Sequence, residues 1–202
     1  MKSYVLLVAL MLSLSLSAQV KLGVKGGLNI SDVHFKHAEY NPRTGWHGGV
    51  LGDFSFNKSM SIRGELLYSV KGFRYGLVGA NGIGTMKFSY INLPLLFAYS
   101  PSDNWQLLLG PELGLLMAAK SSFGGNEHDV KRNFEKDDLA LNIGAGYHFS
   151  RNFGAELRYS FGLAPLQEGI LTDDFGNVIG EGKDGANRVL HLGVFYLLTK
   201  KR

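Results

Sequence analysis

The chain has 202 residues, a net charge of +4, 27 glycines, 13 Phe and 9 Tyr residues, and no cysteine. This length fits one domain, and the lack of cysteine excludes a scaffold held by disulfides. Lys and Arg are spread along the chain and the net charge is modest, so we expect no nucleic-acid partner. The glycines and aromatic residues favour β structure with many turns.

The first residues have the pattern of an export signal. Lys2 supplies a positive start, and Val5–Leu16 ("VLLVALMLSLSL") is a run of apolar residues and Ser. This run is too short to span a bilayer, which needs about 20 residues. Cleavage after Ser17 satisfies the small-x-small rule with Ser15, and cleavage after Ala18 fits it less well. A short anchor or a buried first strand are the alternatives to export.

Eight segments with period-two alternation follow, as expected for β-strands with two different faces. In "SIRGELLYSVKG" (Ser61–Gly72), apolar Leu66 and Tyr68 alternate with charged Arg63 and Glu65. Each segment has about the 9–11 residues that a tilted strand needs to cross a bilayer. The predicted strands are Gln19–Ile30, Trp46–Phe56, Met60–Lys71, Ser89–Tyr99, Trp105–Lys120, Leu139–Phe149, Phe153–Leu163 and Asn187–Leu198.

The connections between these segments alternate in length. Three are short, namely Asn57–Ser59, Ser100–Asn104 and Ser150–Asn152. Four are long, namely Ser31–Gly45, Gly72–Phe88, Ser121–Asp138 and Ala164–Ala186. Short periplasmic turns and long extracellular loops on an even number of strands are the plan of an outer-membrane barrel, whereas a soluble sandwich gives no reason for the alternation. The sequence therefore predicts an all-β fold, an eight-stranded antiparallel up-and-down transmembrane β-barrel.

The charged residues of the strands all lie on one face. The apolar face is expected to contact outer-membrane lipid, and the charged face is expected to line the lumen. Opposite charges in an enclosed space must pair, because an unpaired buried charge is very costly. The predicted lumen network is Lys21, Lys25, Asp53, Arg63, Glu65, Lys71, Glu112, Glu156 and Arg158.

Aromatic residues gather near the expected membrane boundaries. Those beside short turns are Tyr99, Trp105, Tyr147, Phe149 and Phe153, and those toward the long connections are Trp46 and Phe161. Aromatic side chains prefer the interface between lipid and water. These residues are therefore predicted to form two interfacial girdles.

Five strand motifs resemble those of the PorT family of outer-membrane β-barrels. The resemblance covers nearly the whole chain after the export signal, and its motifs are diffuse. It implies an eight-stranded barrel in a Gram-negative outer membrane, with residues 1–18 as the signal peptide and residues 19–202 as the barrel domain. The family's namesake is linked to a protein secretion and maturation system. The motifs are "KLGVKGGLNIS" (Lys21–Ser31), "GELLYSVKG" (Gly64–Gly72), "YINLPLLFAY" (Tyr90–Tyr99), "LLGPELGLLMAAK" (Leu108–Lys120) and "LNIGAGYHF" (Leu141–Phe149).

The chain departs from that family pattern in places. Asn92 and Ala98 occupy lumen positions where the family tends to carry charge, so the interior network is expected to differ. The chain ends "YLLTKKR" in place of a terminal aromatic residue, a role that Tyr196 is expected to take. Pro94 and Pro111 each remove a hydrogen-bond donor from the sheet, and we expect a bulge near each.

Signals of cofactor or metal chemistry are weak. The glycine-rich stretch "GANGIG" (Gly79–Gly84) has no strand–turn–helix context, so a loop is favoured over a phosphate cradle. His34 with His37, or Glu127–Asp129, could bind a divalent metal in the long connections, but nothing fixes their geometry. We expect no cofactor and no metal, and solvated loop residues at these positions.

The sequence favours a protein that is not an enzyme. A catalytic set inside the barrel would have to combine His148, His191, Glu112 or Ser160. The sequence shows no recognisable spacing of a nucleophile, a base and an orienting residue. We expect a structural barrel, or one that contacts a protein partner through its extracellular loops. A small-solute pore and an accessory factor of a secretion system are the alternatives, and the oligomeric state stays open.

Overall fold

The structure, a computed structural model, describes residues 19–34, 41–76, 82–172 and 178–198. The predicted signal peptide at residues 1–18 lies outside them. Within these ranges no helix is long and apolar enough to cross a membrane. The elements are β1 (Gln19–His34), β2 (Asn41–Ser55), β3 (Met60–Gly76), β4 (Ile83–Tyr99), β5 (Trp105–Phe123), β6 (Asn126–Asp129), the 3₁₀-helix η1 (Lys131–Asn133), β7 (Asp137–His148), β8 (Phe153–Gly162), β9 (Gln167–Thr172), β10 (Val178–Asp184) and β11 (Ala186–Leu198).

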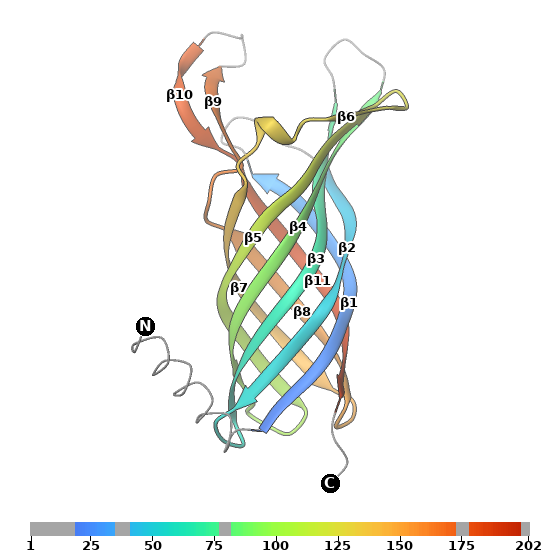
Figure 1. Cartoon of the computed structure of the whole chain (residues 1–202), viewed down its shortest axis with the longest axis vertical. Helices are drawn as coiled ribbons and strands as arrows, with labels where there is room; N and C mark the ends of the chain where they lie inside the picture. Colours follow the sequence, from blue (N-terminus) through green and yellow to red (C-terminus); the bar gives the residue numbers. More distant parts are fainter. Residues whose placement is uncertain (1–18, 35–40, 77–81, 173–177, 199–202) are drawn as a thin grey trace, which may run out of the picture.

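Eight of the strands form a closed ring in which each strand is antiparallel to its neighbours. The hydrogen-bonded order is β4, β3, β2, β1, β11, β8, β7 and β5, and β5 pairs again with β4. Closure gives every barrel strand a partner on both sides, which is the condition for a sheet to cross lipid. The predicted eight-stranded up-and-down antiparallel barrel is confirmed, and Figure 1 shows its tilted wall.

The two ends of the barrel differ in their connections. At the short-turn end the hairpins close through Phe56–Ser59, Ser100–Asn104 and Phe149–Asn152. β1 begins and β11 ends at the same end, where Leu22 pairs with Leu198. The opposite end, called the loop end below, carries the longer connections (Figure 1).

The expected strand boundaries are wrong at the loop end, because much of the long connections is β structure. β3 continues to Gly76 and β4 begins at Ile83. β5 turns back into β6 through Gly124 and Gly125, whose φ angles of 58° and 88° favour glycine. β9 and β10 form a separate two-stranded sheet that rises beyond the ring (Figure 1). Pairing continues there because each strand keeps satisfying the backbone groups of its neighbour.

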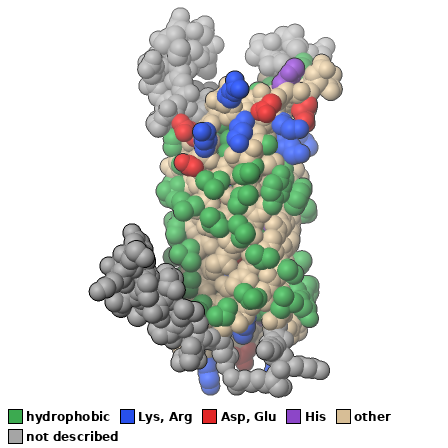
Figure 2. Space-filling view, in the orientation of Figure 1, with side chains coloured by type: hydrophobic (Ala, Val, Ile, Leu, Met, Phe, Trp, Pro, Cys, Tyr) green, Lys and Arg blue, Asp and Glu red, His purple; other side chains and the backbone are tan. Residues whose placement is uncertain are grey.

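The two faces of the wall follow the alternation seen in the sequence. Leu66 and Tyr68 are exposed on the outside, whereas Arg63 and Glu65, which belong to the alternate set of the same strand, are buried inside. Val70 belongs to the same alternate set as Leu66 and Tyr68, but unlike them it is buried. Figure 2 shows apolar side chains over the wall and charged side chains gathered near its ends. The outside is therefore suited to lipid contact over most of its height.

The bulges expected at the two prolines are not present in the described strands. Pairing lapses beside Pro94 and Pro111, but the register is the same on both sides of each lapse. A proline removes a donor without adding a residue, so the ladder loses a bond and keeps its register. The irregularity in the β4–β5 ladder lies between Ser89 and Tyr90 instead.

The barrel interior is layered along its axis. The middle is polar and charged, and it is described in the next subsection. Two small apolar clusters lie toward the short-turn end, one around Phe195 and one around Leu96. At the loop end a larger apolar group, the loop-end cluster, fills the interior. It consists of Val33, Phe73, Phe88, Tyr90, Leu116, Ala119 and Leu166.

Replacing Leu66 by Arg is expected to lower the free energy of unfolding by about 2–4 kcal/mol, because the residue faces outward near mid-height and is 49% exposed. The matched control is Val20→Arg at the short-turn end of β1, which is also exposed and is expected to cost about 0–1 kcal/mol. Urea unfolding of both variants in lipid vesicles measures the difference. Equal costs would show that the outer wall is not embedded in lipid at this height.

Candidate functional site

Ion pairs span the barrel from one wall to the opposite wall. β3 and β8 are four places apart in the ring of eight strands, so they face each other across the lumen. Arg158 of β8 donates from Nη1 to Glu65 Oε2 of β3 at 3.0 Å, and Arg63 Nη1 of β3 donates to Glu156 Oε2 of β8 at 3.1 Å. Both bridges join the same two strands. In the first the arginine is on β8 and the glutamate on β3, and in the second the arginine is on β3 and the glutamate on β8.

Lys25 and Asp53 complete this group, which we call the cross-barrel network. Lys25 of β1 donates to Glu65 Oε1 at 3.1 Å and also to Glu156, so it links both bridges. Arg63 binds Asp53 through two parallel hydrogen bonds of 2.9 and 2.8 Å, the strongest geometry for such a pair. The network therefore holds three cations and three carboxylates, and their side chains are at most 6% exposed.

A second group lies nearer the loop end. Lys71 donates to Glu112 at 3.3 Å and to Asp138 at 3.4 Å. Three side-chain amides complete the shell of these carboxylates: Asn92 and Asn142 donate to Glu112, and Asn187 donates to Asp138. Asn92 stands where the family pattern expects charge, and here it serves as a neutral donor.

Asp138 is an interior residue that the sequence reasoning missed. The sequence pattern predicts a strand that begins at Leu139 and so places Asp138 at the end of the connection Ser121–Asp138. In the structure β7 begins at Asp137. Asp138 has the same parity as buried Ala140 and Asn142, so extending the alternation by one residue would have found it.

Lys21 was expected in the lumen network and does not join it. Its Cα partner across the β1–β2 ladder is Asp53, but both oxygens of Asp53 are bound by Arg63. Lys21 is half-buried at the short-turn end and has no ion pair with any described residue. The other eight predicted residues all lie in the interior and all form ion pairs.

Between the two charged groups lies a layer of neutral polar side chains. Asn29 Oδ1 is 2.7 Å from His47 Nδ1 and 2.8 Å from His191 Nδ1. His191 Nε2 lies 2.9 Å from the hydroxyl oxygen of Ser160, which donates to Asn142. Ser160 and His191 thus lie at the distance of a nucleophile and its base, but Ser160 donates its only hydrogen to Asn142 and is 1% exposed, so the pair is neither oriented for proton transfer nor open to a substrate.

The loop end of the lumen is capped. Phe134, directly after η1, packs edge-on against Phe88 of the loop-end cluster with ring centroids 4.8 Å apart. The backbone N–H of Glu135 donates to the carbonyl of Leu166 at 2.9 Å, and the N–H of Leu116 donates to the carbonyl of Lys136 at 2.7 Å. Residues 130–136 therefore lie across the apolar interior as a lid.

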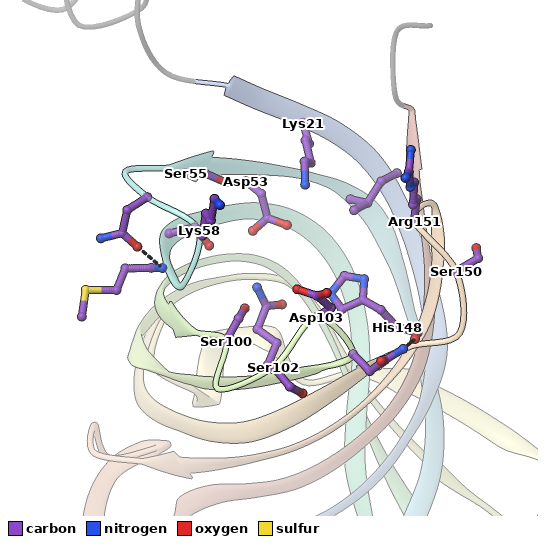
Figure 3. A pocket seen from close by; sticks show the side chains of 16 residues that line it. Lys21, Asp53, Ser55, Lys58, Ser100, Ser102, Asp103, His148, Ser150 and Arg151 are labelled. Carbon is purple, nitrogen blue, oxygen red and sulfur yellow. Dashed lines mark hydrogen bonds between the residues drawn. The ribbon is translucent and has the colours of Figure 1, made fainter.

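The short-turn end opens into a polar mouth. Figure 3 shows it from close by, with side chains from all three short turns around it. The cavity has a volume of about 490 Å³. Lys21, Asp53 and His148 line it from strands β1, β2 and β7. Arg63 donates to Gln106 Oε1 at 2.6 Å, so Gln106 and Asp53 both connect the lining to the cross-barrel network.

The predicted interfacial aromatics lie on the outside of the wall. Near the short-turn end, Trp105 packs on Tyr147 with ring centroids 5.1 Å apart, Tyr147 packs on Phe149 at 5.3 Å, and Phe149 stacks on Phe153 at 5.6 Å. Tyr99 is exposed at the end of β4. Toward the loop end, Trp46 packs on Tyr68 at 5.5 Å.

The candidate metal residues that the structure describes, Glu127–Asp129, do not form a metal site. The described residues contain no group of three or more His, Cys, Asp and Glu side chains that could hold a metal ion. Glu127 instead accepts a hydrogen bond from Lys120, which holds the pKa of that carboxyl below its usual value. The side chains of His34 and His37, and Gly79–Asn81 of the glycine-rich stretch, lie outside the described residues.

Replacing Glu65 by Gln is expected to lower the free energy of unfolding by about 3–5 kcal/mol, because Lys25 and Arg158 then lose a buried partner. Urea unfolding in lipid vesicles measures the change. The control is Glu127→Gln, which removes an exposed carboxylate and is expected to leave stability unchanged. Equal stability of the two variants would rule out a structural role for the bridges.

Replacing Phe134 by Ala is expected to loosen the lid. An aromatic pair contributes about 0.5–1.5 kcal/mol, so exchange of the Glu135 amide hydrogen, which is bonded to Leu166, should become roughly 2–10-fold faster. Hydrogen exchange detected by mass spectrometry measures this rate. Phe149→Ala at the opposite end should leave it unchanged. An unaltered rate in Phe134→Ala would mean that the aromatic contact does not hold the lid.

Two solved structures have this architecture. Ail, the attachment invasion locus protein of Yersinia pestis, is 17% identical, with a TM-score of 0.52 over 89% of this chain and 99% of Ail. Neisserial surface protein A is 14% identical, with a TM-score of 0.58 over 88% of this chain and 98% of that protein. At these identities the similarity shows the fold alone. No curated protein sequence matches the chain.

A family model gives the assignment. The model for the outer membrane protein beta-barrel domain matches residues 15–168, which is most of the chain. The closed ring, the apolar outer wall and the short turns at one end agree with it. The chain belongs to the outer membrane protein beta-barrel domain family, and it is an integral protein of the outer membrane.

Proposed function

We propose that this protein is a non-enzymatic, closed barrel that acts in the outer membrane as a structural element and presents its loop end to a partner outside the cell. Outer-membrane barrels face the periplasm with their short turns and the exterior with their longer connections. The observation that carries the proposal is the pair of bridges between β3 and β8, because they cross the lumen at its full width.

Several features argue against a pore. Eight strands leave an interior about as wide as the side chains that fill it. At two glycines of the inner wall a neighbouring ring occupies the space beside the backbone: a Cβ at Gly154 would lie 2.4 Å from Phe195, and one at Gly27 would lie 2.9 Å from His47. The loop-end cluster and its lid add an apolar layer above the charges.

The loop end offers more surface than a simple set of loops. β5 with β6, and β9 with β10, extend the β structure beyond the ring (Figure 1). Backbone pairing gives these extensions a shape that long irregular loops lack, which reduces the entropy lost on binding. Ail, which shares the fold, has been crystallised with the heparin analogue sucrose octasulfate. We infer that this end, with a protein as its partner, is the interaction surface.

The likeness of the strand motifs to the PorT family supports a narrower alternative, an accessory role in protein secretion. Deleting the gene and assaying secreted proteins tests this alternative directly. Unchanged secretion would leave the structural and display role as the better account.

The refolded protein is expected to give a flat trace in planar bilayers, because paired charges and an apolar layer fill the lumen. The double variant Glu65→Ala/Arg158→Ala removes one bridge and is expected to add small, reproducible open steps. The control Lys120→Ala/Glu127→Ala removes an exposed pair and should stay flat. Open steps of the size of general porins in the unaltered protein would overturn the closed barrel in favour of a small-solute pore.

A further inference from the structure

The periplasmic mouth is a cavity with a closed floor. Its volume is about 490 Å³, and its lining includes Asp53 and Gln106, both of which bind Arg63 of the cross-barrel network. A molecule that enters from the periplasm therefore meets a wall of paired charges and cannot pass through. The mouth can hold a ligand, but the proposed closed lumen gives it no route to the exterior.

The charges in this mouth are unbalanced. Lys21 points inward over the cavity (Figure 3), and it has no ion pair with a described residue because Arg63 occupies Asp53. Lys58 and Arg151 lie on two different turns around the rim, and neither forms an ion pair with a described residue. Against these three cations stands a single carboxylate of the described lining that is not already paired, that of Asp103. The lining thus has a net positive charge.

Two side-chain amides of the lining are left with donors, whereas the Asn104 amide donates to the His148 carbonyl and is left with its oxygen. The Asn57 side-chain oxygen already accepts the N–H groups of Ser59 and Met60, and the Gln106 oxygen accepts from Arg63. Both amides therefore keep NH₂ groups that no described residue binds. Ser61 and Ser100 add hydroxyls that no described residue binds. Hydrogen-bond donors beside unpaired cations fit a group that only accepts hydrogen bonds.

We propose that the periplasmic mouth binds an oxyanion group, a carboxylate or a phosphate, of a hydrophilic periplasmic molecule. Among the described residues, the lining contains no Phe, Tyr or Trp side chain on which a sugar ring or a base could stack, so recognition rests on charge and hydrogen bonds. Lys21 is the central ligand because it lies inside the cavity, whereas Lys58 and Arg151 contribute from the rim.

The test is isothermal titration of the refolded full barrel in nanodiscs at low ionic strength, with succinate and inorganic phosphate as probes and succinamide as the uncharged control. Binding of one or both anions, without binding of succinamide, is expected. Binding of succinate alone would show that the site takes a carboxylate group, and binding of phosphate alone would show that it takes a phosphate group. Competition between the two anions would show that one site accepts either group. Absence of binding by both anions would overturn the proposal.

Variants locate the site. Lys21→Gln should weaken anion binding about tenfold, as expected for the loss of one charge-assisted hydrogen bond, and Lys21→Arg should retain it. The matched control, Lys131→Gln, removes a cation from the lid at the opposite end and should change nothing. Arg151→Gln, at an exposed turn that does not contribute to the core, should weaken binding less than Lys21→Gln. Equal effects of Lys21→Gln and Lys131→Gln would show non-specific attraction and reject the site.

Discussion

The interior of this protein depends on charges that meet across the barrel axis. Arg63 and Glu65 extend from β3, and Glu156 and Arg158 extend from the strand directly opposite, so each wall carries one cation and one carboxylate at nearly the same height. Removing these groups from water is costly, and only close pairing with further hydrogen bonds offsets that cost. Lys25 supplies such bonds to both bridges. The bridges thereby hold β3 and β8 at a fixed distance, and this distance agrees with the diameter of an eight-stranded ring.

The closed ring and the charged interior support each other. A sheet in lipid must close, because its edge groups would otherwise have no partner. Closure of eight strands creates an enclosed space just wide enough for side chains. Long charged side chains fill that space where the outer wall is apolar, and aromatic and aliphatic side chains fill it at the loop end. Side chains therefore occupy the lumen at several heights, which supports the proposal that the protein acts through its two ends.

The two ends differ in chemistry. The loop end is closed by an apolar cluster and a lid, and it carries β extensions that form a defined surface. The short-turn end is open, polar and positively charged, because one lysine of β1 has lost its cross-strand partner to an arginine. With the functions proposed above, the barrel would contact one type of molecule outside the cell and another in the periplasm without passing anything between them.

The sequence by itself determined the eight strands, their two faces and the alternation of short and long connections, because period-two patterning and turn residues act locally along the chain. It also identified eight of the interior charges, since a charged residue among alternating apolar ones can point only away from lipid. Only the tertiary structure decided which charges pair and that Lys21 has no ion pair with a described residue. Those outcomes depend on ring position and strand register, and in a closed ring a residue's partner stands on a strand that is distant in sequence. The extension of β structure at the loop end likewise depends on backbone pairing between neighbouring strands. The sequence of one strand alone does not predict that pairing.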